Sequence, residues 1–192
     1  MYIFGYGSLI NAYSRQRTGN TGNAIPVLVD GLQRYWGKIE GSYPISPLVV
    51  VQEKGQCNGV LVEVDTLALA EFDKREHGYQ RVEIQWDNIT GVGNQPLEVK
   101  GSVWVYVNND FCSPCCQKPI IQSYVDTVLA GCLAISPQFA ELFMLTTKGW
   151  QHAYENDRHQ PKYGNLAHVF EQEKSIIDQL VQSAIIRSNQ SL

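Results

Sequence analysis

The sequence carries no large excess of charge of either sign and no long apolar run. Its 192 residues include 15 Lys and Arg against 19 Asp and Glu, a formal net charge of -4. Phosphate backbones and anionic membranes attract strongly electropositive surfaces, so we expect neither nucleic acid nor a membrane as a partner. No stretch approaches the ~20 consecutive apolar residues that a membrane-spanning helix needs.

Signals for secretion and for disulfides are also missing. The apolar start of the chain has no basic residues and is soon interrupted by Gly5 and Gly7, unlike the apolar core of a signal peptide. The five cysteines are an odd number. Three of them crowd together as Cys112, Cys115 and Cys116, which is a poor disulfide framework for a secreted domain. These features predict a cytoplasmic protein whose cysteines are free thiols.

The composition that is present suits one globular domain. With 44% apolar and 18% charged residues, the chain can bury one sizeable core. Short apolar and β-branched runs, separated by Gly, Pro, Asn and Ser, predict a mixed or antiparallel sheet in the first half. The expected strands cover residues 1–6, 24–29, 48–52, 60–64, 79–84 and 101–108.

Helical spacing dominates the second half of the chain. The expected helices cover residues 66–76, 122–133, 138–146 and 166–187, and 11–23 is expected to be a polar loop with one helical turn. We found no repeat, low-complexity tract or dividing linker. We therefore predict a single α+β domain over 1–192, with 134–192 as a helical C-terminal extension.

The stretch FGYGSL, residues 4–9, ends the first expected strand with two glycines around a tyrosine. Because Gly5 and Gly7 have no Cβ, the chain can adopt positive φ there and a ligand can approach the backbone N–H groups closely. Several such donors facing one cavity would bind a carboxylate or an oxyanion, and Ser8 would add a hydroxyl. The alternative is a kinked strand end packed beneath a helix.

The stretch DKREHGYQR, residues 73–81, places Glu76 at the end of an expected helix. The negative end of the helix dipole raises the free energy of an ionised carboxylate there, which suits a general base. The alternative is a solvated carboxylate paired with Lys74, Arg75 or Arg81.

A third segment, PIIQSYVDTVLAGCL at residues 119–133, starts a helix with a Ser-Tyr pair and reaches a glycine seven residues after Tyr124. In this order, the three segments resemble the γ-glutamylcyclotransferase family and its avirulence-induced plant relatives. The resemblance extends from Tyr2 to about Leu133 and leaves the last third of the chain unexplained.

The resemblance implies a small mixed β-barrel with flanking helices and a pocket at one end. Members of this family cyclise a γ-glutamyl group: the α-amine attacks the γ-carbonyl, an amine, amino acid or peptide leaves, and 5-oxoproline forms without metal or cofactor. Glu76 matches the general acid/base, and Tyr124 would donate its phenol to the substrate. The substrate-binding residues implied are Gly5, Tyr6, Gly7, Ser8, Leu9, Tyr79 and Tyr124.

The leaving group stays open, because further signatures of glutathione-degrading relatives are not placed in this sequence. Glutathione, a γ-glutamyl amino acid, a γ-glutamyl amine and a γ-glutamyl-protected metabolite all fit. A different class also stays open, namely a non-catalytic protein that binds a small carboxylate or amine on the same fold. Glu76 argues against it, since a carboxylate beside an anion-binding loop serves proton transfer better than anion binding.

Three other features have competing interpretations. The C-x-x-C of FCSPCC, residues 111–116, can serve redox exchange or zinc binding, with inert loop thiols as the main interpretation. Residues 152–165 are either a lid that recognises the leaving group or a polar connection. A hydrolase triad of Ser8, His159 and Asp157 is a further alternative, but Ser8 lacks the G-x-S-x-G motif that such a nucleophile has. The last helix packs on the domain or dimerises, giving a monomer or a weak homodimer.

Overall fold

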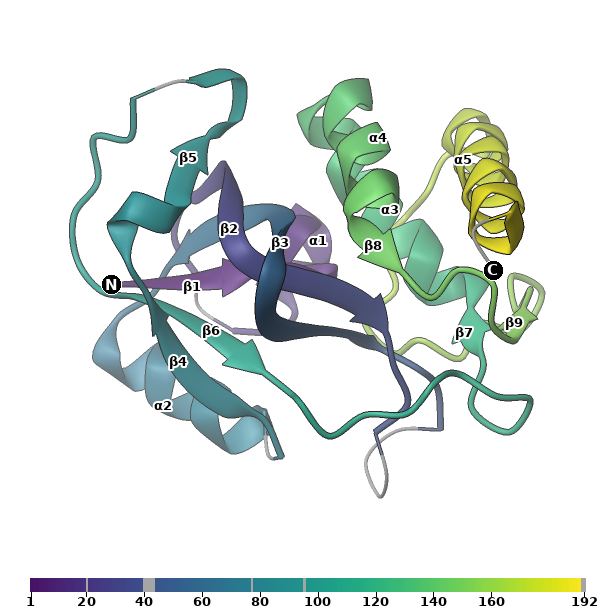
Figure 1. Ribbon diagram of the computed structural model, residues 1–192, viewed down its shortest axis with the longest axis horizontal. Coiled ribbons are helices and arrows are strands. Elements are labelled where there is room, and N and C mark those ends of the chain that lie inside the picture. Colours follow the sequence, from purple (N-terminus) through teal and green to yellow (C-terminus); the bar gives the residue numbers. More distant parts are fainter. Residues whose placement is uncertain (20, 40–43, 77, 95, 191–192) are drawn as a thin grey trace.

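The computed structural model describes residues 1–19, 21–39, 44–76, 78–94 and 96–190, and Figure 1 shows the order of their elements. The strands are β1 (Tyr2–Gly5), β2 (Ala24–Trp36), β3 (Leu48–Glu63), β4 (Gln80–Ile84), β5 (Ile89–Gly91), β6 (Val103–Val107), β7 (Ile120–Ile121), β8 (Thr147–Lys148) and β9 (Tyr154–Glu155). The helices are α1 (Ala12–Gln16), α2 (Thr66–Arg75), α3 (Gln122–Ile135), α4 (Pro137–Thr146) and α5 (Glu171–Gln190), with short 3-10 turns η1 (Ser8–Ile10), η2 (Trp86–Asn88) and η3 (Val92–Asn94).

One curled, mixed sheet organises the fold. Its strand order is β4-β6-β1-β3-β2-β5, and β8 pairs with β2. β1 runs antiparallel to β3 and parallel to β6. Within the described residues no pairing joins the edge strands β4 and β5, so the expected small barrel takes the form of a curled half-barrel with flanking helices (Figure 1). The predicted α+β fold class is confirmed.

β3 corrects the prediction of two separate strands at 48–52 and 60–64. It is one strand of 16 residues, and most of its length pairs with β2. Between the two expected strands, residues 56–59 stay in the ladder with β2, whereas residues 53–55 lie at a shift of register and have exposed or half-buried side chains. The two strands shift register between Asp30 and Leu32, where Gly31 adopts a φ of 81°.

The expected helix at 166–187 begins later, at Glu171. Phe170 precedes it and donates its backbone N–H to the Glu173 carboxylate at 2.9 Å, an arrangement that caps the first turn. Upstream, the N–H of Ala167 donates to Thr127 Oγ1 of α3 at 3.3 Å. The apolar spacing at 166–170 therefore belongs to an extended segment that crosses α3.

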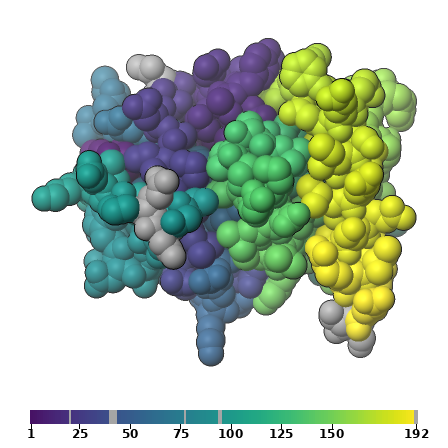
Figure 2. Space-filling view, turned by 90° about the horizontal axis from the view of Figure 1, so that it is seen from above, coloured from purple at the N-terminus to yellow at the C-terminus, as the bar shows by residue number. Residues whose placement is uncertain are grey.

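Two hydrophobic clusters form the core. One consists mainly of strand residues such as Phe4, Val29 and Val105, and lies within the curl of the sheet. The other joins the opposite face of the sheet to the helices. α5 packs into it through Ile177, Val181 and Ala184, and Figure 2 shows α5 lying beside α4. No helix of the described residues has the length and apolarity needed to cross a membrane. The division into one domain with an extension at 134–192 stays a prediction.

Candidate functional site

A cavity of about 410 Å³ lies where the loop after β1, the start of β3, the end of α2 and the first turn of α3 meet. Every site residue expected from the sequence lines it. These residues are Gly5, Tyr6, Gly7, Ser8, Leu9, Glu76, Tyr79 and Tyr124. Segments far apart in the chain thus contribute to one space, as the resemblance implies.

The two glycines of the loop act through close packing, which corrects the expectation of positive φ. Gly7 has a φ of -134°, and Gly5 is not among the glycines with positive φ. A Cβ on Gly7 would lie 2.8 Å from the Tyr124 hydroxyl, and one on Gly5 would lie 2.6 Å from the Cβ of Leu9. The loop therefore needs glycine because α3 and the following turn approach its backbone closely.

Gly7→Ala should lower the free energy of unfolding by ~1–3 kcal/mol, because the added methyl must displace the Tyr124 hydroxyl or the loop. Urea unfolding measures this change. Gly19→Ala is the matched control, since a Cβ there meets nothing within 4 Å. Equal stability of the two variants would contradict the close approach.

Tyr124 presents its hydroxyl to the loop from the first turn of α3. Burial, followed by the neighbouring Tyr163 and Tyr79, raises the pKa of Tyr124 well above its usual value, and the backbone of Leu48 and Ser8 offsets a smaller part of this shift. The phenol therefore stays protonated at neutral pH.

The approach of α3 to the loop depends on Gly131 and Asn11. A Cβ on Gly131 would lie 2.6 Å from the backbone nitrogen of Asn11. The Asn11 side chain caps α1 and donates to the carbonyl of Thr127 at 2.9 Å. This packing accounts for the glycine that follows Tyr124 by two helical turns.

Glu76 lies immediately after α2, with its side chain 17% exposed. Its Oε1 accepts from Nε and Nη2 of Arg75 at 3.0 and 2.9 Å. Of the pairings considered from the sequence, the one with Arg75 forms, whereas Arg81 bonds to Asp73. Glu76 thus combines an ion pair with a place on the cavity wall.

The turn after Glu76 brings Tyr79 to the cavity. Gly78 adopts a φ of 92°, which ends the helical path, and the N–H of Tyr79 donates to the carbonyl of Glu76 at 3.0 Å. Tyr6 lies nearby, and its hydroxyl donates to the carbonyl of Tyr106 at 2.8 Å. Burial, with smaller contributions from Tyr79 and Glu76, raises the pKa of Tyr6 well above its usual value.

Arg34 was missed by the sequence interpretation, although it lies directly behind the loop. It is fully buried, and its Nη1 donates to the carbonyl of Tyr6 at 3.1 Å. All the hydrogen-bond acceptors that the described residues provide for it are neutral oxygens: Tyr6 O, Asn58 O and Oδ1, Phe143 O, Thr146 Oγ1 and Thr147 Oγ1. Burial lowers the pKa of Arg34, yet a guanidinium remains charged in proteins. The signal for its burial was available in the sequence: Leu32, Arg34 and Trp36 alternate along the strand, so Arg34 shares a face with two apolar residues.

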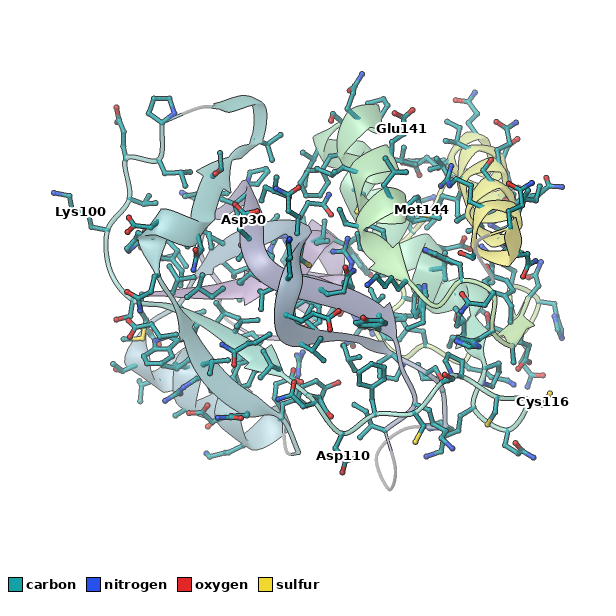
Figure 3. The ribbon with its side chains drawn as sticks, viewed as in Figure 1. Asp30, Lys100, Asp110, Cys116, Glu141 and Met144 are labelled. Carbon is teal, nitrogen blue, oxygen red and sulfur yellow. The ribbon has the colours of Figure 1, made fainter. Side chains whose placement is uncertain are left out.

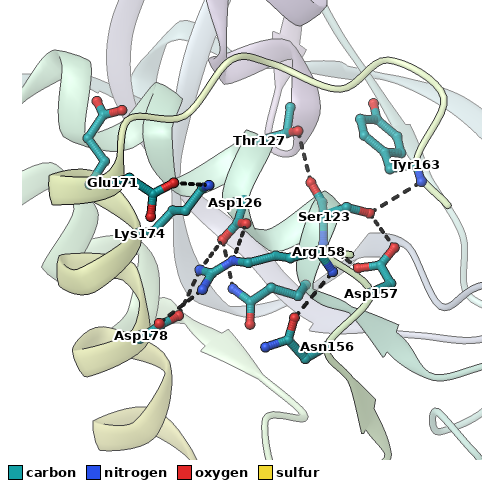
Figure 4. A network of polar contacts seen from close by, with 12 residues as sticks. Ser123, Asp126, Thr127, Asn156, Asp157, Arg158, Tyr163, Glu171, Lys174 and Asp178 are labelled. Carbon is teal, nitrogen blue, oxygen red and sulfur yellow. Dashed lines mark hydrogen bonds and ion pairs between the residues drawn. The ribbon is translucent and has the colours of Figure 1, made fainter. Parts of the chain in front are cut away.

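The segment near residue 160 also reaches the cavity. Lys162, Tyr163, Gly164 and Asn165 line it, and the rings of Tyr163 and Tyr124 lie 4.7 Å apart. The alternative triad is not assembled. Asp157 bonds to Ser123 (Figure 4), and His159 is exposed and does not line the cavity.

The cysteine cluster lies apart from this site. Cys112 and Cys116 are exposed, and Figure 3 shows Cys116 at the edge of the molecule. Among the described residues no cysteine lines the cavity. No group of three or more His, Cys, Asp or Glu side chains in the described part of the chain is arranged to hold a metal ion.

Solved structures share this fold. One named gamma-glutamyl cyclotransferase has a TM-score of 0.61 at 14% identity and covers 93% of this chain and 98% of its own. An uncharacterized protein from Homo sapiens has a TM-score of 0.59 at 15% identity and covers 92% of this chain and 97% of its own. YkqA from Bacillus subtilis has a TM-score of 0.54 at 18% identity and covers 74% of this chain and 52% of its own. At these identities the likeness concerns the fold.

The sequence itself gives the family. A family model described as "Gamma-glutamyl cyclotransferase, AIG2-like" matches residues 3–125, so the chain belongs to that family. The resemblance inferred from the three segments is confirmed. Among curated proteins, none matches the chain.

Proposed function

We propose that the protein cyclises γ-glutamyl groups to 5-oxoproline and releases an amine, amino acid or peptide. The observation that carries the proposal is that Glu76 lines the same cavity as the loop Tyr6 to Leu9 and Tyr124. Family membership supports the same reaction class.

The proposed reaction needs one proton carrier. The substrate's α-nitrogen forms a bond to the γ-carbonyl carbon, and the bond from that carbon to the leaving nitrogen breaks. Glu76 takes one proton from the α-ammonium, which frees the amine for attack, and returns it to the leaving nitrogen as that bond breaks, so one carboxylate serves both steps. The α-nitrogen loses a second proton as it becomes the ring amide, and the released amine takes up one proton from solvent. Arg75 holds the carboxylate in place at the end of α2.

Negative oxygens of the substrate need hydrogen-bond donors. The loop after β1 and Tyr124 line the cavity, and their proposed roles are to offer backbone N–H groups and a phenol. Because the pKa of Tyr124 is raised, its phenol keeps its proton at neutral pH and can donate it to such an oxygen. The buried charge of Arg34 behind Tyr6 favours an oxyanion or carboxylate in front of the loop.

A binding protein without catalysis is the second candidate, since the same cavity would hold a small carboxylate or amine. A panel of γ-glutamyl amino acids, peptides and amines, assayed for 5-oxoproline and for binding, separates the two. Release of 5-oxoproline from at least one compound supports the enzyme. Binding across the panel with no turnover would contradict it and favour the second candidate.

Alkylation of Cys112 and Cys116 should leave 5-oxoproline release within about twofold of the unmodified protein, because both thiols lie away from the cavity. Mass spectrometry gives the extent of labelling and the assay gives the rate. A rate that falls in proportion to labelling would instead support redox control by the exposed thiols, of which Cys112 belongs to the C-x-x-C.

A further inference from the structure

One wall of the cavity comes from outside the family match. Residues 162–165 line the same space as Glu76, whereas the match ends at residue 125. Resting on the proposed function, we infer that this wall is the subsite for the leaving group and that Lys162 binds a carboxylate there. The preferred substrates are then γ-glutamyl amino acids or peptides rather than γ-glutamyl amines.

A buried carboxylate fixes the wall to α3. Asp157 is 1% exposed; its Oδ1 accepts from the N–H of Ser123 at 2.7 Å, and its Oδ2 accepts from the Ser123 hydroxyl at 2.6 Å and from the N–H of Lys162 at 2.8 Å. The N–H of Tyr163 donates to the Ser123 hydroxyl at 3.3 Å, as Figure 4 shows. The wall is therefore anchored to the same helical turn that carries Tyr124.

A second set of contacts holds the segment between α3 and α5. Arg158 donates from Nε and Nη2 to Asp126 of α3 at 2.7 and 2.8 Å, and from Nη1 and Nη2 to Asp178 of α5 at 2.9 and 2.7 Å (Figure 4). These hydrogen bonds raise the pKa of Arg158, so it stays charged. A wall held in this way loses little conformational entropy on binding, which suits it to recognition.

The charged side chains that line the cavity, among the residues that the structure describes, are those of Glu76, Arg75 and Lys162. A γ-glutamyl group carries an α-ammonium and an α-carboxylate and is neutral overall. A carboxylate on the leaving group gives the substrate one net negative charge, which an ammonium on this wall would bind.

Lys162 is that ammonium, because the Arg75 guanidinium is bonded to Glu76. The Lys162 ammonium bonds to Glu155 at 2.6 and 2.8 Å, and Glu155 is not among the residues that line the cavity. An ammonium has three N–H donors, so one remains for a ligand. The half-exposed side chain leaves it accessible.

The anchoring contacts of the wall allow the Lys162 charge to be tested alone. They use the backbone N–H groups of Lys162 and Tyr163, so Lys162→Met leaves them in place. Two substrates, γ-glutamylalanine and γ-glutamylethylamine, differ only in the carboxylate on the leaving group. Lys174→Met is the matched control, because Lys174 also pairs with a glutamate and does not line this cavity.

Wild-type protein should prefer γ-glutamylalanine in kcat/KM, and Lys162→Met should reduce that preference about tenfold by losing one charge-assisted contact. Lys162→Arg should retain the preference, and Lys174→Met should leave it unchanged. An unchanged preference in Lys162→Met, or equal loss for both substrates, would overturn the inference.

Calorimetric binding of the same two compounds separates this inference from the proposed function. If neither compound is turned over, the proposed cyclisation fails for them, and the ratio of their dissociation constants still tests the subsite. A ratio that favours γ-glutamylalanine and falls in Lys162→Met supports the subsite. A ratio near one in the wild type would overturn it.

Discussion

Glu76→Gln is expected to reduce 5-oxoproline release by ~10²–10⁴, because an amide of the same size cannot carry the proton between the two nitrogens. The fold should survive the change. Glu76 lies at the end of α2, and the part of its interaction that is lost is an ion pair with the partly exposed Arg75. Such pairs contribute about 1 kcal/mol or less to stability.

Glu71→Gln is the control for this result. Glu71 lies on the same helix and also pairs with a neighbouring base, Lys74, but both side chains are more than 70% exposed. We expect wild-type turnover from this variant and equal urea midpoints for both variants. Wild-type turnover in Glu76→Gln would show that the proton moves by another route and would remove Glu76 from the mechanism.

Arg34→Met is expected to lower the free energy of unfolding by about 3 kcal/mol or more. The substitution removes the donors for several buried oxygens at once, on the loop, on β3 and at the end of α4. Each buried acceptor left without a partner costs about 1–3 kcal/mol. Relief from burying the guanidinium offsets part of this cost, so the expected loss is well below the sum.

Arg17→Met is the comparison for Arg34→Met. Arg17 is exposed and its guanidinium lies 5.8 Å from the Tyr13 ring, so its loss should change stability by about 0.5 kcal/mol or less. Arg34→Lys should also be destabilised, because an ammonium with three donors cannot replace the guanidinium fork. Urea unfolding of the three variants measures these effects. Wild-type stability of Arg34→Met would contradict a central role for its hydrogen bonds.

Local signals predicted much of the candidate site. The glycines of the loop, the helix end before Gly78 and the Ser-Tyr start of α3 are each short-range features, and the residues they indicated line one cavity. Local signals did not explain why glycine is needed. The atom that approaches Gly7 is the hydroxyl of Tyr124, which only the folded chain brings there.

Other features depended on partners distant in the sequence. β3 continues through a polar stretch because β2 pairs with it, and the segment before α5 stays extended because Thr127 bonds to it. Arg34 is buried because oxygens from β3 and α4 surround it. Polar contacts hold residues 152–165, and the last residues of this segment reach the cavity. Recognition of the leaving group by this segment stays a prediction.

Product analysis by NMR tests the proposed cyclisation most directly. Wild-type protein is incubated with γ-glutamylalanine, and the products are identified over time. Cyclisation predicts 5-oxoproline and alanine in equal amounts, with the α-nitrogen of the substrate retained in the ring. Glutamate in place of 5-oxoproline would indicate hydrolysis, and either that result or binding without any product would contradict the proposed cyclisation for this substrate.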